Sequence, residues 1–587
     1  MQKKWLIKNI KYDYKRLSQE LGMPEEISRC IINRCPGTLD EIKDYLNPSL
    51  ESLHDPSLMK DMDLAVELIM EAIDSEEHIR LMGDFDIDGS MSIYVVYMAL
   101  KKLGAIVSYD IPDRVTEGYG LNEAMVEKAA EDGVGLIITL DNGISAFDGV
   151  NYAKELGLMV IVTDHHDVPF IIEDGARVET IPLADAVINP KREECNYPFK
   201  MLCGAGVAFK LITQLYQEMG VDESELWELL PFVAIATVGD IMDLTGENRV
   251  IVKHGLELVK KTKNQGLRAL AELSKVDLND LSTYAIGFII GPCFNAAGRL
   301  DTAKKTVRLM LAQGEEAKSL AQELYDLNQT RRAMTEDGIA LAEEEMVTQG
   351  FREDPIIVLK LEDVHESLAG IIAGRIKEKY YRPTIVLTKT ENGLKGSGRS
   401  IEEYNMFEGL HEVKDLMVKF GGHPMAAGMS LEESNLDIFR DSLHKGTSFT
   451  KDDLTPKVVI DARVNPAIIT ESFLNKLNTL EPFGKGNGKP VFAEKNLLIS
   501  RVDLLGKDKN HVKLIFDIQG KFVEGLYFFA TKTLLDLVDD GSNPTVSLEN
   551  SLKGKKCDIL FYPDLNTYNG FSKVQLKITD FRLSDLS

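Results

Sequence analysis

The sequence has no apolar run long enough to cross a bilayer as a helix, although hydrophobic residues make up 44% of its 587 positions. At the N-terminus, Lys3 and Lys4 precede a short apolar stretch, but charge returns at Lys8, so no signal-peptide core is present. We therefore expect no membrane partner and a cytoplasmic location.

The sequence also lacks a cysteine motif that could hold zinc or define a disulfide framework. None of its cysteines forms a CxxC pair or has an adjoining histidine at zinc-site spacing. We expect reduced thiols at all six positions, which are Cys30, Cys35, Cys195, Cys203, Cys293 and Cys557.

The sequence has fewer basic than acidic residues, with 67 Lys and Arg against 93 Asp and Glu, which gives a net charge of −26. This balance argues against broad, nonspecific coating of nucleic acid, which needs many phosphate contacts. It allows a local basic groove, and some of the acidic excess can bind metal, although most of these carboxylates must be solvated surface.

Repeated alternation of apolar runs and helical patterns predicts an α/β fold with several domains. After a helical lead-in over 1–60, a parallel-sheet domain is expected over 61–254. Ile93, Val96, Tyr97 and Leu100 mark the face of its first crossover helix. The predicted strands cover 79–82, 106–111, 136–140, 159–163 and 186–188.

The second half of the sequence predicts three further regions. Residues 255–349 are mostly helical and end in a long connecting helix that contains Leu320, Leu324 and Arg331-Arg332. A second α/β region follows over 350–445, and a polar linker ends near 456. Short β-rich runs over 456–587 are typical of a small barrel or sandwich.

The acidic loop Asp84-Phe85-Asp86-Ile87-Asp88-Gly89 follows the first predicted strand and precedes a helix. It resembles the start of an EF-hand, but the twelfth position is Val95, where calcium binding needs a bidentate glutamate. A different interpretation fits better, because ligands of open α/β sheets bind at the carboxyl ends of the strands.

Two further strands end in acidic or imidazole side chains. Asp141 directly follows the strand over 136–140, and Asp164-His165-His166 directly follows the strand over 159–163. A single such aspartate is more often a loop residue or a helix N-cap, but three strand ends together favour a shared site. Asp240 ends the apolar stretch 232–238, where a buried carboxylate needs a compensating cation.

This set of ligands predicts a site for divalent metal. Carboxylates with imidazoles suit Mn²⁺ or Mg²⁺, and the absence of cysteine ligands argues against a thiolate zinc site. Two ions together can lower the pKa of water and neutralise a phosphoryl group. Hydrolysis of a phosphate ester is therefore the expected reaction.

Asp84-Phe-Asp-Ile-Asp-Gly, Asp141-Asn142-Gly143, Asp164-His165-His166 and Asp240 resemble the four motifs of the DHH phosphoesterases. The segments 111–120 and Asn295-Ala-Ala-Gly-Arg299 further resemble the RecJ family of single-strand-specific 5′ to 3′ DNA exonucleases. His365, Gly396-Ser-Gly-Arg-Ser400 and Gly421-Gly-His-Pro-Met-Ala-Ala-Gly428 resemble its DHH-associated domain, and the segment from Glu481 to Asn487 with the β-rich tail resembles its OB-fold.

The resemblance implies roles for individual residues. Metal ligands would be Asp84, Asp86, Asp88, Asp141, His165 and Asp240. Asp164 is also expected at the metal, and Asp164 and His166 would each serve either as a ligand or as support for the ligands. The catalytic group would comprise Asp86, Asp88, Asp141, His165, His166 and Asp240. Substrate would be bound by Arg114, Asn295, Arg299, Ser397, Arg399, Gly422, His423 and Lys485.

The tail resembles an OB-fold in which lysines follow the nucleic-acid backbone. Lys485, Lys489, Lys507, Lys509 and Lys513 suit that role, whereas we expect most of Phe492, Phe528 and Phe529 to lie in the barrel core. One departure from the family concerns Cys293, since the family usually carries arginine two residues before Asn295. This difference puts one contact to a terminal phosphate in doubt.

The leading hypothesis is an exonuclease that threads single-stranded DNA between two lobes and releases mononucleotides from the 5′ end, in repair and recombination. The resemblance also implies a single-strand DNA-binding protein and a RecQ-type helicase as partners. Three alternatives stay open: a phosphodiesterase for nanoRNA or cyclic dinucleotides, a pyrophosphatase of the same superfamily, and a RecJ-derived DNA-binding scaffold. The long tail disfavours the small-substrate phosphodiesterase. The aspartate at the start of the first motif disfavours the pyrophosphatase, and the complete ligand set disfavours the scaffold.

Overall fold

The computed structural model describes residues 3–114, 117–118, 120–391, 393–538, 547–568 and 571–584. Val115, Thr116 and Tyr119, which belong to the family-like segment 111–120, lie outside this range. The chain forms two compact units, one containing residues 50–456 and the other combining 3–49 with 457–587. The lead-in expected over 1–60 is therefore divided, and most of it packs with the C-terminal region.

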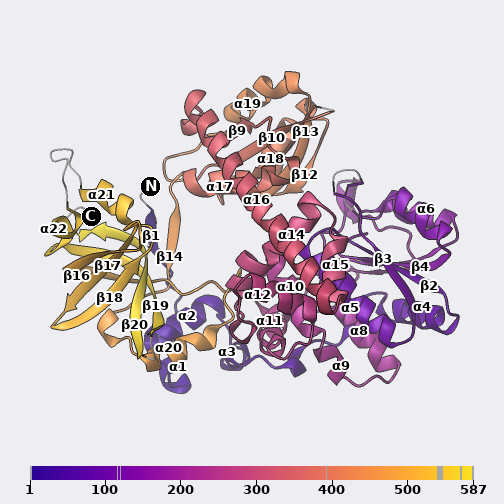
Figure 1. The fold of residues 1–587 in the computed structure, drawn as a ribbon, viewed down its shortest axis with the longest axis horizontal. Coiled ribbons are helices and arrows are strands. Elements are labelled where there is room, and N and C mark those ends of the chain that lie inside the picture. Colours follow the sequence, from indigo (N-terminus) through magenta and orange to yellow (C-terminus); the bar gives the residue numbers. More distant parts are fainter. Residues whose placement is uncertain are drawn as a thin grey trace. The chain divides into compact units, whose positions relative to one another are not determined.

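The first unit begins with the expected parallel sheet, whose strand order is β3-β2-β4-β5-β8. Figure 1 labels its strands β2, β3 and β4. All neighbouring strands in it run parallel. An exposed hairpin, which the sequence did not predict, is inserted before β8. The strands are β2 (His78–Gly83), β3 (Ile106–Asp110), β4 (Val134–Leu140), β5 (Met159–Thr163), β6 (Phe170–Glu173), β7 (Ala176–Glu179) and β8 (Ala186–Ile188).

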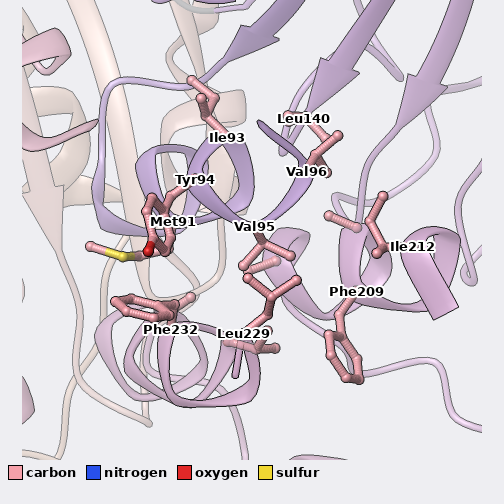
Figure 2. Packing of buried hydrophobic residues seen from close by; sticks show 14 of the residues in the cluster. Met91, Ile93, Tyr94, Val95, Val96, Leu140, Phe209, Ile212, Leu229 and Phe232 are labelled. Carbon is pink, nitrogen blue, oxygen red and sulfur yellow. The ribbon is translucent and has the colours of Figure 1, made fainter. Parts of the chain in front are cut away.

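Helices α4 to α11 accompany this sheet. Helix α5, the crossover between β2 and β3, is buried along most of its length because α8 and α10 cover the side that faces away from the sheet. Figure 2 shows Val95 of α5 between two groups of side chains. Phe209 and Ile212 come from α8, whereas Phe232 belongs to α10 and Leu229 directly precedes that helix. The helices are α4 (Met62–Asp74), α5 (Ile87–Lys102), α6 (Glu123–Glu131), α7 (Phe147–Glu155), α8 (Gly204–Glu218), α9 (Ser224–Trp227), α10 (Leu230–Gly239) and α11 (Gly246–Val259).

The predicted helical region follows, and it ends in the long connecting helix α16. A π-helical turn, Ile286–Ile290, leads directly into α14, which carries the Asn295 to Arg299 motif. The helices are α12 (Gln265–Leu273), α13 (Thr283–Ala285), α14 (Gly291–Leu300), α15 (Lys304–Leu311) and α16 (Gly314–Thr348).

The second α/β region contains a five-stranded sheet with the order β12-β13-β11-β10-β9. Strands β9 and β10 run parallel, joined by α17 as the crossover helix, and the other neighbouring strands of this sheet run antiparallel. The strands are β9 (Ile357–Lys360), β10 (Thr384–Thr390), β11 (Gly393–Arg399), β12 (Lys419–His423) and β13 (Ala426–Leu431). The helices are α17 (Ala369–Tyr380), α18 (Met406–Glu412) and α19 (Leu436–Lys445).

The second unit contains a closed five-stranded barrel, because β16 pairs with both β17 and β19. This ring confirms the predicted OB-fold. Its strands are β15 (Ala462–Arg463), β16 (Phe492–Leu505), β17 (His511–Ile518), β18 (Lys521–Tyr527), β19 (Lys556–Tyr568) and β20 (Phe571–Leu583), of which β15 is an appendage to the ring. The helices α20 (Glu471–Leu477), α21 (Thr531–Val538) and α22 (Leu548–Leu552) accompany it.

The N-terminal segment belongs to the same unit. Strand β1 (Lys4–Ile7) pairs in parallel with β14 (Lys457–Ile460), and helices α1 (Tyr14–Leu21), α2 (Glu25–Arg34) and α3 (Leu39–Leu46) share its hydrophobic core. Buried Asp461 receives hydrogen bonds from Arg34 and Asn33 of α2. The pairing joins segments about 450 residues apart, which no local pattern could predict.

Among the described helices, none is long and apolar enough to cross a membrane. The cytoplasmic location stays a prediction.

Candidate metal and nucleic-acid site

The acidic loop between β2 and α5 is fixed by its own carboxylate. Asp86 caps α5, and its Oδ1 accepts hydrogen bonds from the Asp88 amide at 2.8 Å and the Gly89 amide at 3.1 Å. Asn295 of α14 accepts a hydrogen bond from the Ile87 amide at 2.8 Å. Asn295, which we expected to bind substrate, thus holds the loop that carries the aspartates.

Asp88 lies fully buried against the N-terminus of α8. Its two oxygens accept hydrogen bonds from the amides of Gly204 at 2.6 Å and Ala205 at 2.8 Å. A helix N-terminus stabilises a negative charge. Glycine is required at 204, because a Cβ there would lie 2.5 Å from the Cβ of Asp141. Sequence reasoning missed both residues, although Cys203-Gly204-Ala205-Gly206 directly precedes a helical pattern.

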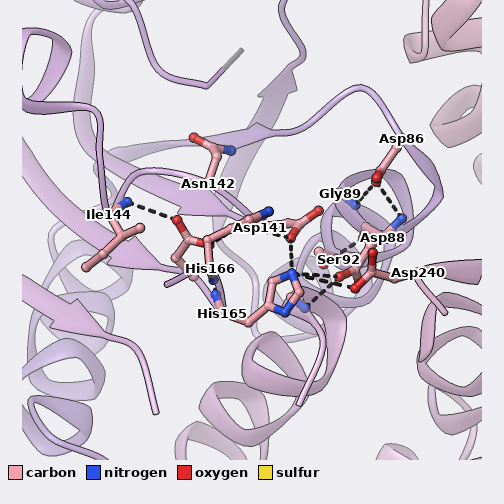
Figure 3. A network of polar contacts seen from close by, with 12 residues as sticks. Asp86, Asp88, Gly89, Ser92, Asp141, Asn142, Ile144, His165, His166 and Asp240 are labelled. Atoms are coloured by element: carbon pink, nitrogen blue, oxygen red, sulfur yellow. Dashed lines mark hydrogen bonds and ion pairs between the residues drawn. The ribbon is translucent and has the colours of Figure 1, made fainter. Parts of the chain in front are cut away.

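His165 lies at the centre of the carboxylates, as Figure 3 shows. Its Nε2 is 3.1 Å from Asp141 Oδ1 and 3.7 Å from an oxygen of both Asp88 and Asp240. Asp141 reaches this position at the end of β4 with a left-handed backbone, φ 63°. Asp240 approaches from the C-terminal end of α10, so residues from strands and helices converge on one imidazole.

These side chains form three overlapping groups in which ligand atoms lie within 4.8 Å of one another. Every member was predicted from the sequence. The groups are Asp141, His165 and His166, then Asp88, His165 and Asp240, and finally Asp84, Asp86 and Asp141.

The chemistry of this cluster fits divalent metal. Burial and repulsion between neighbouring carboxylates raise the pKa of Asp84 and Asp141. Burial lowers the pKa of His165, which favours the neutral imidazole that metal requires. Within the described residues, the buried Asp84 Oδ1 and His165 Nδ1 have no hydrogen-bond partner. Divalent cations would offset the repulsion and satisfy such atoms.

Asp164 and His166 form a supporting pair beside the cluster. Asp164 Oδ1 lies 2.7 Å from His166 Nδ1 and accepts the His165 amide, while its Oδ2 accepts the Ile144 amide at 2.9 Å. Burial raises the pKa of Asp164, but the bond and charge of His166 outweigh it and leave this pKa below its usual value. Of the two roles that the resemblance implies for Asp164, ligand or support, these contacts favour support.

His166 is the more open of the two histidines, with 41% of its side chain exposed. Burial lowers the pKa of His166, but the hydrogen bond and charge of Asp164 outweigh this effect and raise it to about 9. Asp164 therefore fixes this imidazole at Nδ1.

Several predicted substrate residues form an arginine-rich site at the junction of α14, β11 and α17. Arg299 donates to the Ser367 carbonyl at 2.7 Å, and Arg399 donates to Ser397 Oγ at 2.7 Å. A Cβ on Gly370, in the first turn of α17, would lie 2.6 Å from the Arg399 guanidinium. Arg114 packs over the Phe85 ring at 4.7 Å, beside the acidic loop. Guanidinium groups and a helix N-terminus are typical of a phosphate site.

The remaining predicted substrate residues are exposed. Gly422 and His423 lie on the edge strand β12, and His423 is 3.9 Å from Asp167, two residues after His165. Lys485 lies in the second unit, at a turn closed by hydrogen bonds between Gly484 and Asn487.

The barrel corrects one expectation about its aromatic residues. Phe492 is fully buried as predicted, but Phe528 and Phe529 are exposed by 46% and 74%. Both rings pack edge-on against His511, at 5.4 and 4.6 Å. The two phenylalanines lie beyond the end of β18, in the connection to α21, so their side chains do not follow the strand alternation that fills the core.

Three family models match this chain: the DHH family, N-terminal domain, over 78–237; the DHHA1 domain over 353–446; and the RecJ OB domain over 460–580. Together they cover both units.

The chain is also similar to full-length relatives. It is 35% identical to the single-stranded-DNA-specific exonuclease RecJ of Bacillus subtilis, over 97% of this chain and 70% of the relative. It is 34% identical to the Haemophilus influenzae protein of the same description, over 91% and 92%. Crystal structures of RecJ from Thermus thermophilus with Mn²⁺ and with Mg²⁺ match 99% of this chain. They give TM-scores of 0.81 and 0.76 at 26% and 25% identity and cover 79% and 78% of the matched chains.

Proposed function

The chain belongs to the RecJ family, and on that premise we propose that it is a metal-dependent exonuclease acting on single-stranded DNA. It hydrolyses phosphodiester bonds from the 5′ end and releases mononucleotides. The observation that carries this proposal is the convergence of His165 with Asp88, Asp141 and Asp240 at the carboxyl edge of the parallel sheet.

Mn²⁺ or Mg²⁺ are the proposed cofactors, held by Asp84, Asp86, Asp88, Asp141, His165 and Asp240. Two such ions would lower the pKa of an attacking water and neutralise the phosphoryl oxygens. The chain's own contribution is orientation. The α8 amides of Gly204 and Ala205 orient Asp88 and partly oppose the rise in its pKa that burial causes, and Asp164 fixes the His166 imidazole.

The arginine site supports a phosphodiester substrate. Arg114 lies close enough to Asp84 and Asp86 to interact with their charges, and Arg299 interacts with Asp86. Phosphate groups of a strand bound to these arginines would therefore lie next to the metal cluster. This arrangement positions a scissile bond without any contact that reads base sequence.

The test uses one oligonucleotide labelled either at the 5′ or at the 3′ end, as a single strand and as a blunt duplex, with Mn²⁺ or with EDTA. We expect labelled mononucleotide at once from the 5′-labelled strand, and a ladder of shortening fragments from the 3′-labelled strand. EDTA should stop both reactions, and the duplex should be resistant.

Other outcomes would point elsewhere. Cleavage limited to dinucleotides or cyclic dinucleotides would assign the chain to a small-substrate phosphodiesterase, and mononucleotides released first from the 3′ end would overturn the polarity. Binding of single strands without any metal-dependent cleavage would favour a scaffold.

We further propose that a single-strand DNA-binding protein and a RecQ-type helicase supply the substrate. Resemblance to the family supports this step, since an enzyme that acts on single strands needs unwound DNA. Adding a RecQ-type helicase and ATP to the blunt duplex should then allow degradation that either enzyme alone cannot perform.

A further inference from the structure

Arg331, in the middle of α16, is held against α14 by a short chain of contacts. Its Nε donates to Asn328 Oδ1 at 3.1 Å, and Asn328 Nδ2 donates to the Cys293 sulfur at 3.3 Å. Asn328 is 5% exposed and Cys293 is 1% exposed. The guanidinium is therefore anchored at its Nε edge by a buried side chain, whereas most arginines on long helices extend into solvent.

The charges of other arginines act on this guanidinium, and its own charge acts on Arg299. Burial, followed by the charges of Arg114, Arg331 and Arg399, lowers the pKa of Arg299 to about 10. Burial together with the nearby Arg332 and Arg375 also lowers the pKa of Arg331. Arg331 thus extends the cationic group of Arg114, Arg299 and Arg399 along α16.

Carboxylates balance only part of this group, because the charges of Asp84, Asp86 and Glu366 act on Arg114 and the charge of Asp86 acts on Arg299. Within the part of the chain that the structure describes, none of the four arginines forms an ion pair with Asp or Glu within 4.0 Å, and no carboxylate charge acts on Arg331 or Arg399. Holding partly buried guanidiniums together costs free energy unless an anion compensates. For Arg331 and Arg399, the compensating partner is therefore an anion that comes from outside the chain.

We propose that Arg331 is a phosphate-binding residue of the substrate site, acting beside Arg299. The inference rests on the proposed function and adds a residue that the motifs do not mark. It also explains how the site accommodates Cys293. At that position α14 presents a buried thiol rather than a cation, and α16 places the Arg331 guanidinium two hydrogen bonds away. The ligand is a phosphate of the bound single strand.

A purely structural role for Arg331 makes a different prediction. If the contacts through Asn328 serve only to join α14 and α16, removing the guanidinium would lower stability and leave the affinity of folded protein for DNA unchanged. If Arg331 binds phosphate, removing the guanidinium would instead lower the affinity for DNA and the salt dependence of binding, while stability stays nearly constant.

The experiment compares Arg331→Gln with Arg332→Gln, which removes the same charge from the exposed neighbouring position. Binding of a 5′-phosphorylated and a 5′-hydroxyl oligothymidylate is measured by fluorescence anisotropy in EDTA over a range of salt concentrations. KM and kcat are measured with Mn²⁺, and Tm is recorded for each variant.

For Arg331→Gln we expect Kd and KM to rise about tenfold, kcat to stay within about threefold, and the slope of log Kd against log salt to fall by about one. Arg332→Gln should change Kd less than about twofold. Arg331→Lys should recover part of the affinity, because charge is restored without the guanidinium geometry. A larger loss of affinity for the 5′-phosphorylated strand would place Arg331 at the terminal phosphate. Equal losses for the two strands would place it at an internal phosphate.

Equal Kd values for Arg331→Gln and wild-type protein at unchanged Tm would overturn the proposal. Because binding is measured without metal, the result does not depend on nuclease activity. A wild-type protein that binds strands but does not cleave them would contradict the proposed function alone.

Discussion

The amide nitrogen of Gly204 lies 2.6 Å from Asp88 Oδ2, so the start of α8 holds the most deeply buried carboxylate of the site. The same glycine lies directly against Asp141. One position without a side chain therefore lies between two proposed ligands, Asp88 in the first turn of α5 and Asp141 at the end of β4.

Replacing Gly204 with alanine should displace Asp141, because the new Cβ would meet its Cβ at 2.5 Å. A shift of about 1 Å at a catalytic group costs about a hundredfold in rate, so we expect that loss in kcat with Mn²⁺. Gly374→Ala on α17 is the control, since nothing lies within 4 Å of its Cβ position. Full activity of Gly204→Ala would show that the close approach is unimportant.

Asp141→Asn should lower the cleavage rate about a hundredfold or more while leaving the binding of single strands in EDTA largely intact. The substitution keeps the size of the side chain but removes a negative charge from two of the three candidate metal-binding groups. Asp148→Asn, on an exposed position of α7, controls for loss of charge. Retained nuclease activity in Asp141→Asn would refute the metal assignment.

Phe529→Ala should weaken binding of single-stranded DNA in EDTA by roughly 1–3 kcal/mol, the usual contribution of one stacked base. The Phe529 ring is 74% exposed and packs against His511. His511 closely follows Lys507 and Lys509 in the sequence. Phe522→Ala removes another ring of the barrel, 63% exposed on β18, and should change affinity little. Equal losses in both variants would indicate a nonspecific effect of surface aromatics.

Asp110→Asn should destabilise the protein in a pH-dependent way. Burial raises the pKa of Asp110, but Lys304 and Lys128 outweigh this effect and leave it below its usual value. A carboxylate with a lowered pKa stabilises the fold above its unfolded pKa, near 3.9, and loses this contribution as pH falls through the folded value. The difference in Tm between Asp110→Asn and wild-type protein should therefore be largest at pH 7 and shrink below about pH 4. Asp437→Asn, 93% exposed at its side chain, should show no such difference.

Asp461→Ala should make the second unit unfold more readily, because it leaves the largely buried Arg34 side chain without its ion-pair partner at 2.8 Å. Breaking such a pair costs about 3–5 kcal/mol. Trp5 lies in this unit and Trp227 in the first, and they are the only two tryptophans. Fluorescence of Trp5 in a Trp227→Phe background therefore reports unfolding of the second unit. Arg16→Gln, at an exposed pair with Glu20, should have almost no effect.

The candidate metal-binding cluster could be predicted from sequence because its residues lie next to elements whose periodicity is local. Asp141 and His165 come directly after apolar strands, and the carboxyl ends of parallel strands share one edge. The role of Asp164 could not be predicted in this way. The orientation of the Asp164 carboxylate depends on the Ile144 amide and the His166 ring, which only the folded loops bring together.

The barrel shows the same division. Its strands follow from short alternating runs, yet Phe528 and Phe529 were assigned to a core that they do not enter. Hydrophobicity alone does not state which face a residue occupies once a strand ends and the chain turns.

By itself the sequence determined the α/β and barrel folds, the metal chemistry and the family, because these depend on local periodicity and on short motifs. Only the tertiary structure decided that Gly204 holds Asp88, that residues 3–49 pack with 457–587, and that Arg331 joins the other arginines. Each of these depends on contacts between residues more than 30 positions apart. Such contacts form only when the whole chain has packed, and no short pattern in the sequence marks them.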